Sequence, residues 1–273
     1  MSATLYSERS GRGEPLLLLH GWGMNLRVFD PLRARLAAHY EVTAIDLPGH
    51  GRSPWNPAPR EARQLLLAGV AASVPPGATL LGWSLGAQLA LELALDARLA
   101  ISRLVMIAAT PRFVSGEDWP HALPLATLQR FASELARDPS ATVDEFLALQ
   151  ARGSAAADAV LAALRQAVSG HGAARLEALA AGLEFLERTD QRALARAVPL
   201  PALVLSGQHD RITPPAAGLA FAQGLPQGRW IEVRRAGHAP FLSHLEFVSA
   251  SVLEFLEREP SAGAPRQPRQ SSS

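Results

Sequence analysis

The feature that most constrains this chain is a serine held between a strand-like run and a helix-like run. Residues 79–81 end an apolar run typical of a short buried strand, and residues 85–95 are rich in alanine and leucine, as helices are. The segment between them, 82–86, reads GWSLG and fits the pattern GxSxG. Small residues two positions before and after the serine let the neighbouring backbone pass closely, so we expect a strained turn that lifts Ser84 clear of the sheet.

Such a turn suits a nucleophilic serine. The first N–H groups of the following helix have no partner inside the helix, and they point toward the serine hydroxyl. An anion that forms beside Ser84 Oγ would therefore meet donors already in position, the backbone N–H of Leu85 among them. The same pattern also occurs in purely structural turns, so the nucleophile hypothesis depends on finding a base and an acid elsewhere in the chain.

The rest of the chain alternates strand-like and helix-like runs. Such alternation predicts an α/β fold with a mostly parallel central sheet and helices on its faces. The strand-like runs are short and almost wholly apolar, as expected for strands buried on both faces; they cover residues 15–20, 40–45, 79–81, 102–108, 201–206 and 229–233. The helix-like runs cover residues 25–38, 60–73, 85–95 and 241–257.

The segment 112–189 differs in character from what precedes and follows it. It contains amphipathic runs and no convincing strand, and strand-like runs resume after it. We therefore expect a helical lid, residues 112–189, inserted into one α/β core made of residues 1–111 and 190–258. Residues 259–273 form a polar tail rich in proline and serine that we expect to be disordered.

Composition excludes several classes of protein. The 273 residues include no cysteine, which rules out disulfides, a thiolate nucleophile and cysteine metal sites. No HxxH motif, carboxylate cluster or GxGxxG turn after the first strand appears, so we expect neither a metal nor a nucleotide cofactor. The net charge of +1 offers no sign of a nucleic-acid partner, and no apolar run could span a membrane or serve as a signal peptide. We expect a cytoplasmic monomer without cofactors.

A glycine-rich turn, HGWG at residues 20–23, directly follows the first apolar run. Two glycines around a tryptophan let this loop turn back over the strand ends, near the start of the helix that follows Ser84. The backbone N–H of Trp22 is our candidate for a second donor to an oxyanion. The alternative is a tight turn that simply packs an indole.

A serine hydroxyl needs a base within hydrogen-bond reach, and the base needs a partner that fixes its tautomer. Asp210 lies in a glycine-opened loop just after the run 201–206, and His238 lies in the loop after 229–233. We predict that Ser84, Asp210 and His238 form a catalytic triad, with each residue after a different strand at one edge of the sheet. Asp190 is the main alternative for the acid.

Other polar residues are assigned structural roles. In the turn that follows residues 40–45 we expect Asp46 and Arg52 to form a structural charge pair. His50 lies in the same turn, and we expect it to have a structural and not a catalytic role. His171 falls in a helical run of the lid and has an ordinary surface explanation.

These motifs together resemble the α/β-hydrolase superfamily, over nearly the whole chain up to the tail. Within it, the chain is similar to esterases that cleave the methyl ester of a pimeloyl chain carried on acyl-carrier protein during biotin synthesis. The motifs are LLHGWGMN, DLPGHGRS, LLGWSLGAQLA, EDWP, FLALQ and AGHAPFLSH. The resemblance implies a carboxylic ester hydrolase in which Ser84 attacks the ester, the backbone N–H groups of Trp22 and Leu85 hold the oxyanion, and His238 protonates methoxide and then activates water.

The resemblance also implies a substrate-binding set. It adds the lid segment FLALQ, which would line the acyl channel, and the set is Trp22, Ser84, Leu85, Phe146, Leu147, Ala148, Leu149, Gln150 and His238. From the residues alone, FLALQ is only an apolar helix face that packs in the core or lid. Two other functions stay open: a general short-chain esterase that needs no carrier, and a non-catalytic binding protein on the same scaffold.

One departure concerns the carrier protein. Because the carrier is acidic, the resemblance implies arginines on the lid around FLALQ. Acidic residues stand there instead, namely Asp144, Glu145 and Asp158. A different set, Arg130, Arg137 and Arg152, is the alternative basic patch on the lid.

Overall fold

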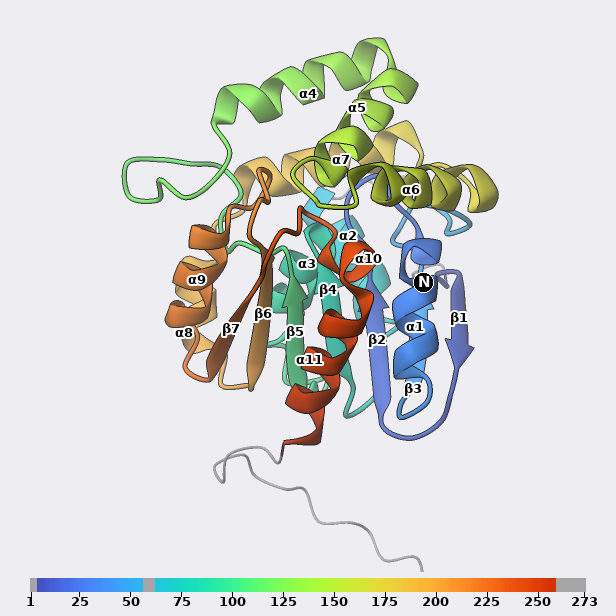
Figure 1. Cartoon of the computed structure of the whole chain (residues 1–273), viewed down its shortest axis with the longest axis vertical. Helices are drawn as coiled ribbons and strands as arrows, with labels where there is room; N and C mark the ends of the chain where they lie inside the picture. The colour runs from blue at the N-terminus through green and yellow to red at the C-terminus, as the bar shows by residue number, and fades with distance from the viewer. Residues whose placement is uncertain (1–3, 56–61, 259–273) are drawn as a thin grey trace, which may run out of the picture.

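The computed structural model describes residues 4–55 and 62–258 (Figure 1). Its centre is a seven-stranded sheet with the order β1-β3-β2-β4-β5-β6-β7. Every neighbouring pair is parallel except β1 and β3, which confirms the predicted mostly parallel sheet. The strands are β1 (Ser7–Ser10), β2 (Pro15–Leu19), β3 (Glu41–Ile45), β4 (Thr79–Trp83), β5 (Arg103–Ile107), β6 (Ala202–Gly207) and β7 (Gly228–Val233).

Helices cover both faces of this sheet, and α1 and α11 lie in front of it in Figure 1. Side chains alternate along β2, so that Leu16 and Leu18 join one apolar cluster and Leu17 and Leu19 the other. The helices outside the chain segment between β5 and β6 are the 3₁₀ helix η1 (Leu26–Phe29), α1 (Asp30–Leu36), α2 (Ala62–Ala71), α3 (Leu85–Leu93), α9 (Pro215–Gly224), α10 (Pro240–Ser243) and α11 (Leu245–Glu257). Helices α1 and α11 contribute to the first cluster, and α2, α3 and α9 to the second.

Between β5 and β6 the chain forms α4 (Leu125–Arg137), α5 (Pro139–Ala151), α6 (Ala157–His171), α7 (Leu176–Arg188) and α8 (Arg192–Ala197). We call α4–α7 the helical insertion. It lies across the end of the sheet where the parallel strands finish, at the top of Figure 1. No helix within residues 4–55 and 62–258 is long and apolar enough to cross a bilayer.

Several element boundaries differ from the sequence-based expectation. The helix expected over 25–38 begins instead as η1, because the Asn25 side chain accepts a hydrogen bond from the backbone N–H of Arg27 and caps this short turn. The closing helix is interrupted at His244, which separates α10 from α11. Strand β1 and helices α8 and α9 were not predicted. The expected disordered tail, 259–273, lies outside the described residues.

The two glycines of GxSxG are required by close backbone contacts. A Cβ on Gly82 would lie 2.4 Å from Ala87 Cα, and one on Gly86 would lie 2.1 Å from the carbonyl oxygen of Leu19. Both distances are far shorter than real Cβ contacts. Any side chain here would therefore push α3 away from the ends of β2 and β4.

Candidate active site

Ser84 occupies the strained turn between β4 and α3. Its φ is 55° and its ψ is −117°, values that non-glycine residues rarely adopt, and it is the N-cap residue of α3. Its backbone N–H donates to the carbonyl oxygen of Ile107 at the end of β5, which holds the turn against the sheet. Only 5% of the residue is exposed, so the serine lies at the sheet edge but beneath other parts of the chain.

His238 and Asp210 meet beside the same edge of the sheet. His238 Nδ1 donates to Asp210 Oδ2 over 2.7 Å, and both side chains are fully or almost fully buried. The two loops approach closely because the chain has glycines there: a Cβ on Gly207 would lie 2.0 Å from the carbonyl oxygen of Gly237. This contact joins two of the three predicted triad residues.

Thr213 is a site residue that sequence reasoning missed. Its backbone N–H and that of Ile212 both donate to Asp210 Oδ1, over 3.0 and 2.8 Å. Its hydroxyl donates to Asp210 Oδ2 over 2.7 Å and lies 3.4 Å from His238 Nδ1. The available signal was the spacing Asp-x-x-Thr, which is typical of a carboxylate that receives hydrogen bonds from its own turn.

Trp83, the residue before the serine, ties the histidine loop to β4. Its indole Nε1 donates to the carbonyl oxygen of His238 over 2.8 Å, and the two rings have centroids 5.7 Å apart. His238 Nε2, the nitrogen that a triad turns toward the serine, has no hydrogen-bond partner among the described residues. Catalytic hydrogen bonds of this kind are often loose until substrate binds.

The loop at residues 20–23 lies directly against the serine. A Cβ on Gly21 would lie 3.3 Å from Ser84 Cβ, so any side chain at this position would crowd the serine. Within the described part of the chain, the backbone N–H groups of Trp22 and Leu85 donate no hydrogen bond. These two N–H groups, one in the loop and one at the first residue of α3, are thus available as donors to an anion.

The indole of Trp22 joins this loop to the helical insertion. Its Nε1 donates to the carbonyl oxygen of Leu179 in α7 over 2.8 Å. Its ring packs edge-on against Phe146 of α5 with centroids 4.9 Å apart, and a Cβ on Gly182 of α7 would lie 2.7 Å from it. The Trp22 indole therefore packs between the core and the insertion, as expected from the alternative in which the turn packs an indole. Its backbone N–H nevertheless stays available as a donor.

The five residues of FLALQ do not share one environment. Phe146 belongs to the same apolar cluster as Trp22, whereas Leu147 belongs to the other cluster, with residues of α6. Ala148 and Leu149 are partly exposed. Gln150 is almost completely buried; its backbone oxygen accepts from the N–H of His238, and neither side-chain polar atom has a partner among the described residues.

An apolar cavity of about 440 Å³ lies within the insertion. Its apolar lining includes Val143 and Leu147 of α5 and Leu179 of α7, and the ion pair Asp144–Arg165 also borders it. A Cβ on Gly23 would lie 3.8 Å from Leu179 and 3.9 Å from Val143, so these two lining side chains also pack near the loop that carries Trp22.

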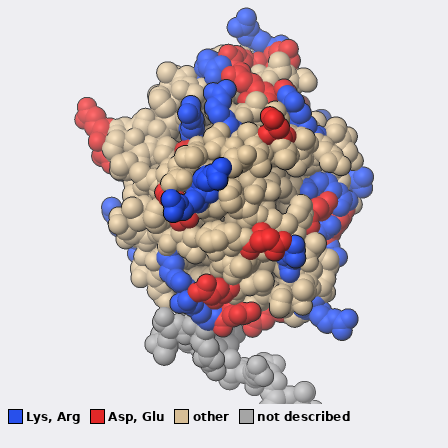
Figure 2. Space-filling model, viewed as in Figure 1, with Lys and Arg blue, Asp and Glu red and all other residues tan. Residues whose placement is uncertain are grey.

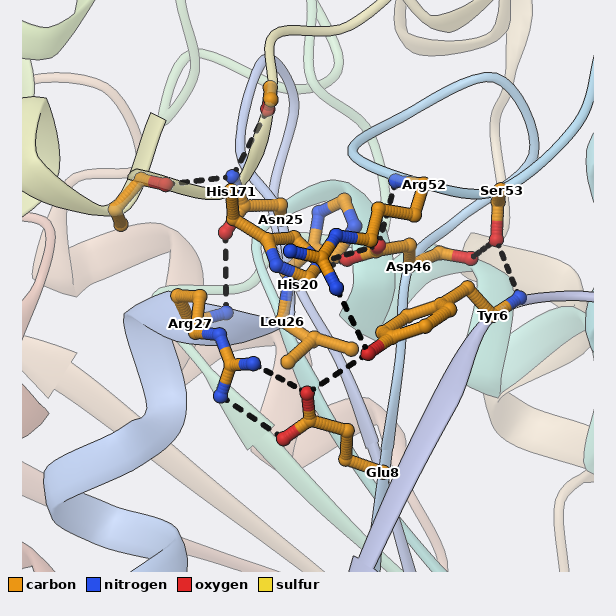
Figure 3. Close-up of polar contacts among 12 residues, drawn as sticks. Tyr6, Glu8, His20, Asn25, Leu26, Arg27, Asp46, Arg52, Ser53 and His171 are labelled. Atoms are coloured by element: carbon orange, nitrogen blue, oxygen red, sulfur yellow. Dashed lines mark hydrogen bonds and ion pairs between the residues drawn. The ribbon is translucent and has the colours of Figure 1, made fainter. Parts of the chain in front are cut away.

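The prediction that Asp46 pairs with the side chain of Arg52 is wrong. Asp46 Oδ2 accepts from the backbone N–H of Arg52 and from His171 Nε2, each over 2.8 Å, while Oδ1 accepts from the backbone N–H of Leu26 (Figure 3). The Arg52 guanidinium donates instead to the hydroxyl of Tyr6. His171 was expected at the surface, but it is buried because it ends α6 against the carboxylate of this core turn.

His20 and His50 lie buried beside this network, with ring centroids 5.2 Å apart. His20 Nδ1 donates to the carbonyl oxygen of Gly21 and Nε2 accepts from the backbone N–H of Leu47, an arrangement that needs a neutral ring. Burial lowers the pKa of His20 well below its usual value. Burial also lowers the pKa of His50 to about 4, against the opposing hydrogen bond to Pro48 and the charge of Asp46.

Because the pKa of His50 is lowered, we expect the folded protein to lose stability in mild acid. Between pH 7 and 5 the unfolded chain binds protons at His50 that the folded protein does not, so the free energy of unfolding falls with pH by about 2 kcal/mol for this residue. Urea unfolding at both pH values should show this fall, and His50→Gln should reduce it by the same amount. A variant with an unchanged difference between pH 7 and 5 would show that His50 is not the group responsible.

Asp190, the other candidate acid, lies on the surface. Its carboxylate pairs with the guanidinium of Arg192 and lies 3.9 Å from that of Arg112, and its side chain is 40% exposed, against 0% for Asp210. Among the described residues, no group of three or more His, Asp or Glu side chains could hold a metal ion.

Known proteins with similar sequences indicate the family of this chain. A family model for the alpha/beta hydrolase fold matches residues 14–245. A protein of Xanthomonas oryzae pv. oryzae, named pimeloyl-[acyl-carrier protein] methyl ester esterase, is 43% identical over 251 residues, covering 92% of this chain and 98% of its own. A protein of Stenotrophomonas maltophilia with the same name is 41% identical over 252 residues, covering 92% and 96%.

Solved structures agree on the fold. A thermophilic esterase from Thermogutta terrifontis superposes with a TM-score of 0.76 at 26% identity and covers 92% of each chain. A bromoperoxidase from Bacillus anthracis superposes with a TM-score of 0.83 at 22% identity, covering 93% of this chain and 95% of its own. The family model spans most of the described core and insertion, and the expected resemblance is confirmed: this chain belongs to the alpha/beta hydrolase fold family.

Proposed function

We propose that this protein is a serine carboxylesterase that hydrolyses the methyl ester of a pimeloyl chain carried on acyl-carrier protein. The products are methanol and a free terminal carboxylate. The activity and substrate come from the names of relatives that are 41–43% identical over almost their whole length. The observation that carries the proposal is the buried hydrogen bond between His238 Nδ1 and Asp210, at the sheet edge where Ser84 lies in its strained turn.

In this reaction Ser84 Oγ attacks the ester carbonyl while His238 Nε2 takes the hydroxyl proton. The tetrahedral intermediate collapses, the bond to the methoxy oxygen breaks, and His238 returns the proton so that methanol leaves. A water molecule then gives its proton to the same nitrogen and attacks the acyl-serine. The bond between the acyl carbon and Ser84 Oγ breaks, and His238 returns the proton to Oγ as the free acid leaves. Asp210, acting as the positioning partner, keeps the proton on Nδ1 and leaves Nε2 free to accept.

The negative charge on the carbonyl oxygen would be held by two backbone N–H groups. Those of Trp22 and Leu85 come from the loop and the helix that converge on Ser84, and neither donates a hydrogen bond to another described residue. Preorganised donors of this type each contribute on the order of 3 kcal/mol to transition-state stability.

The helical insertion would act as the lid. Phe146 packs on Trp22, the backbone oxygen of Gln150 accepts from the N–H of His238, and Ser84 itself is only 5% exposed. The apolar cavity between α5, α6 and α7 could receive methylene groups of an acyl chain. We include Leu147, Ala148 and Leu149 in the substrate-binding set as neighbours on the same helix.

The salt dependence of the rate distinguishes a carrier-specific esterase from a general esterase. We expect kcat/KM for the carrier-bound methyl ester to fall about tenfold between 0.05 and 0.5 M NaCl, because salt screens docking of an acidic carrier. The rate on neutral p-nitrophenyl butyrate should change less than about twofold. Both rates are measured by steady-state assays of the wild-type protein.

A protein that hydrolyses p-nitrophenyl butyrate but not the carrier-bound ester would be a general carboxylesterase. A protein that hydrolyses neither, and whose Ser84 does not react with a fluorophosphonate probe, would be a binding protein on a hydrolase scaffold. Either result would contradict the proposal.

A further inference from the structure

Two arginines on helices of the insertion around the FLALQ segment, Arg130 and Arg165, are neutralised by acidic neighbours. Arg130 pairs with Glu134 and with Glu145, and Arg165 makes a two-bond pair with Asp144 over 2.7 Å. Figure 2 shows blue and red side chains intermixed on the upper part of the molecule, where the insertion lies. The insertion face therefore does not present a single-sign field to an acidic partner.

A different basic surface arises where three turns meet beside the candidate active site. The turn between α5 and α6, the turn after β6 and the turn after β7 are joined by backbone hydrogen bonds. The N–H of Ala155 donates to the carbonyl oxygen of Arg235 over 2.9 Å, and the N–H of His209 donates to that of Ala236 over 2.8 Å. His209 Nδ1 also lies 2.9 Å from the carbonyl oxygen of Gly153.

Each of these turns carries exposed arginine. Arg152 comes from the first, Arg211 from the second, and Arg234 and Arg235 from the third; all four are exposed. None makes an ion pair within residues 4–55 and 62–258, although most other arginines described there do. We call these four residues the turn-arginine cluster. Two acidic residues near them in the sequence, Asp158 and Glu232, likewise form no ion pair there, whereas Asp210, next to Arg211, is buried and pairs with His238.

The turn-arginine cluster borders the proposed triad. Arg211 directly follows Asp210, and Arg235 precedes His238 by three residues. A Cβ on Gly237, next to His238, would lie 2.8 Å from the carbonyl oxygen of Arg152. The positive charges thus stand at the outer surface of the same loops whose buried side chains form the His238–Asp210 pair.

We propose that the turn-arginine cluster is the docking surface for the acidic carrier protein that delivers the ester. Four arginines that have no ion pair among the described residues, on a chain whose net charge is only +1, form a local positive field, and an acidic helical carrier complements it. Docking there places the carrier beside the loops that hold the reacting groups, within reach of a substrate tethered on a flexible arm. This inference rests on the proposed function, because it needs a carrier-bound substrate.

The test is charge reversal at two cluster residues, Arg152→Glu with Arg234→Glu. Within residues 4–55 and 62–258, neither side chain makes an ion pair that the change would break. We expect kcat/KM for the carrier-bound methyl ester to fall about 10- to 100-fold, mainly through KM, while kcat/KM for p-nitrophenyl butyrate stays within about twofold. The salt dependence of the carrier reaction should weaken in the same variant.

Two single variants are the matched controls. Arg196→Glu changes an exposed arginine of α8, and Arg137→Glu changes one on the insertion; neither residue makes an ion pair in the described residues. Each should lower carrier-ester kcat/KM less than about threefold.

The proposal is overturned if the double variant keeps the wild-type rate on the carrier-bound ester, or if Arg137→Glu alone has the larger effect. Equal losses on both substrates would also overturn it, because they would report damage to the site and not to docking. A wild-type protein that cleaves p-nitrophenyl butyrate but not the carrier-bound ester would instead overturn the proposed function itself.

Discussion

Replacing Ser84 by alanine is expected to lower kcat by about 10⁴- to 10⁶-fold on any ester that the protein hydrolyses. The hydroxyl would be the only atom of this site that bonds covalently to the acyl group, so His238 and the backbone donors could not compensate for its loss. What remains after the substitution would be the modest acceleration of a water attack near the oxyanion donors. Burst kinetics and labelling by a fluorophosphonate probe should both disappear.

A second buried serine provides the control for Ser84→Ala. Ser249 of α11 is about as buried, and its hydroxyl donates to the carbonyl oxygen of Glu246 within the same helix, not to a residue of the proposed triad. Ser249→Ala should keep more than about half of the wild-type kcat, and both variants should unfold at similar temperatures. If Ser84→Ala retained turnover within about tenfold of the wild type, Ser84 would not be the nucleophile.

Much of the fold could be predicted because most strands are buried on both faces. Such strands read as continuous apolar runs, as Leu16 to Leu19 do, and each run ends in a loop with glycine or proline. Strand β1 was not predicted because its sequence, SERS, is polar. The strand lies partly exposed at the edge of the sheet, where no apolar run is needed. Its pairing with β3 is decided by backbone hydrogen bonds, which leave little trace in side-chain pattern.

The candidate site was predictable where a residue follows a strand in a glycine-bearing loop, as Ser84, Asp210 and His238 do. Contacts between distant segments were not. His171 contacts Asp46 from 125 positions away in the sequence, and the sequence around either residue gives no sign of this contact. The charges on the insertion show the same limit. Helix packing decides that Arg165 pairs with Asp144 while Arg152 has no ion pair in the described part of the chain.

Asp210→Asn should lower kcat by about 10³- to 10⁴-fold with little change in KM. The geometry fixes how the new amide would sit. Two backbone N–H groups, from Ile212 and Thr213, donate to Oδ1, so an oxygen must stay at that position. The amide nitrogen would then replace Oδ2 and donate toward His238 Nδ1. The imidazole ring of His238 would then carry its proton on Nε2 instead of Nδ1. A protonated Nε2 could no longer accept the proton of Ser84.

Asp190→Asn is the matched control, since it makes the same chemical change at the competing carboxylate. Asp190 is paired with Arg192 at the surface, so we expect this variant to keep more than about half of the wild-type kcat. The pH profiles of kcat for both variants, measured on p-nitrophenyl butyrate, separate a tautomer effect from unfolding. If Asp190→Asn lost activity while Asp210→Asn kept it, the buried contact to His238 would be structural and the acid would lie at the end of the insertion.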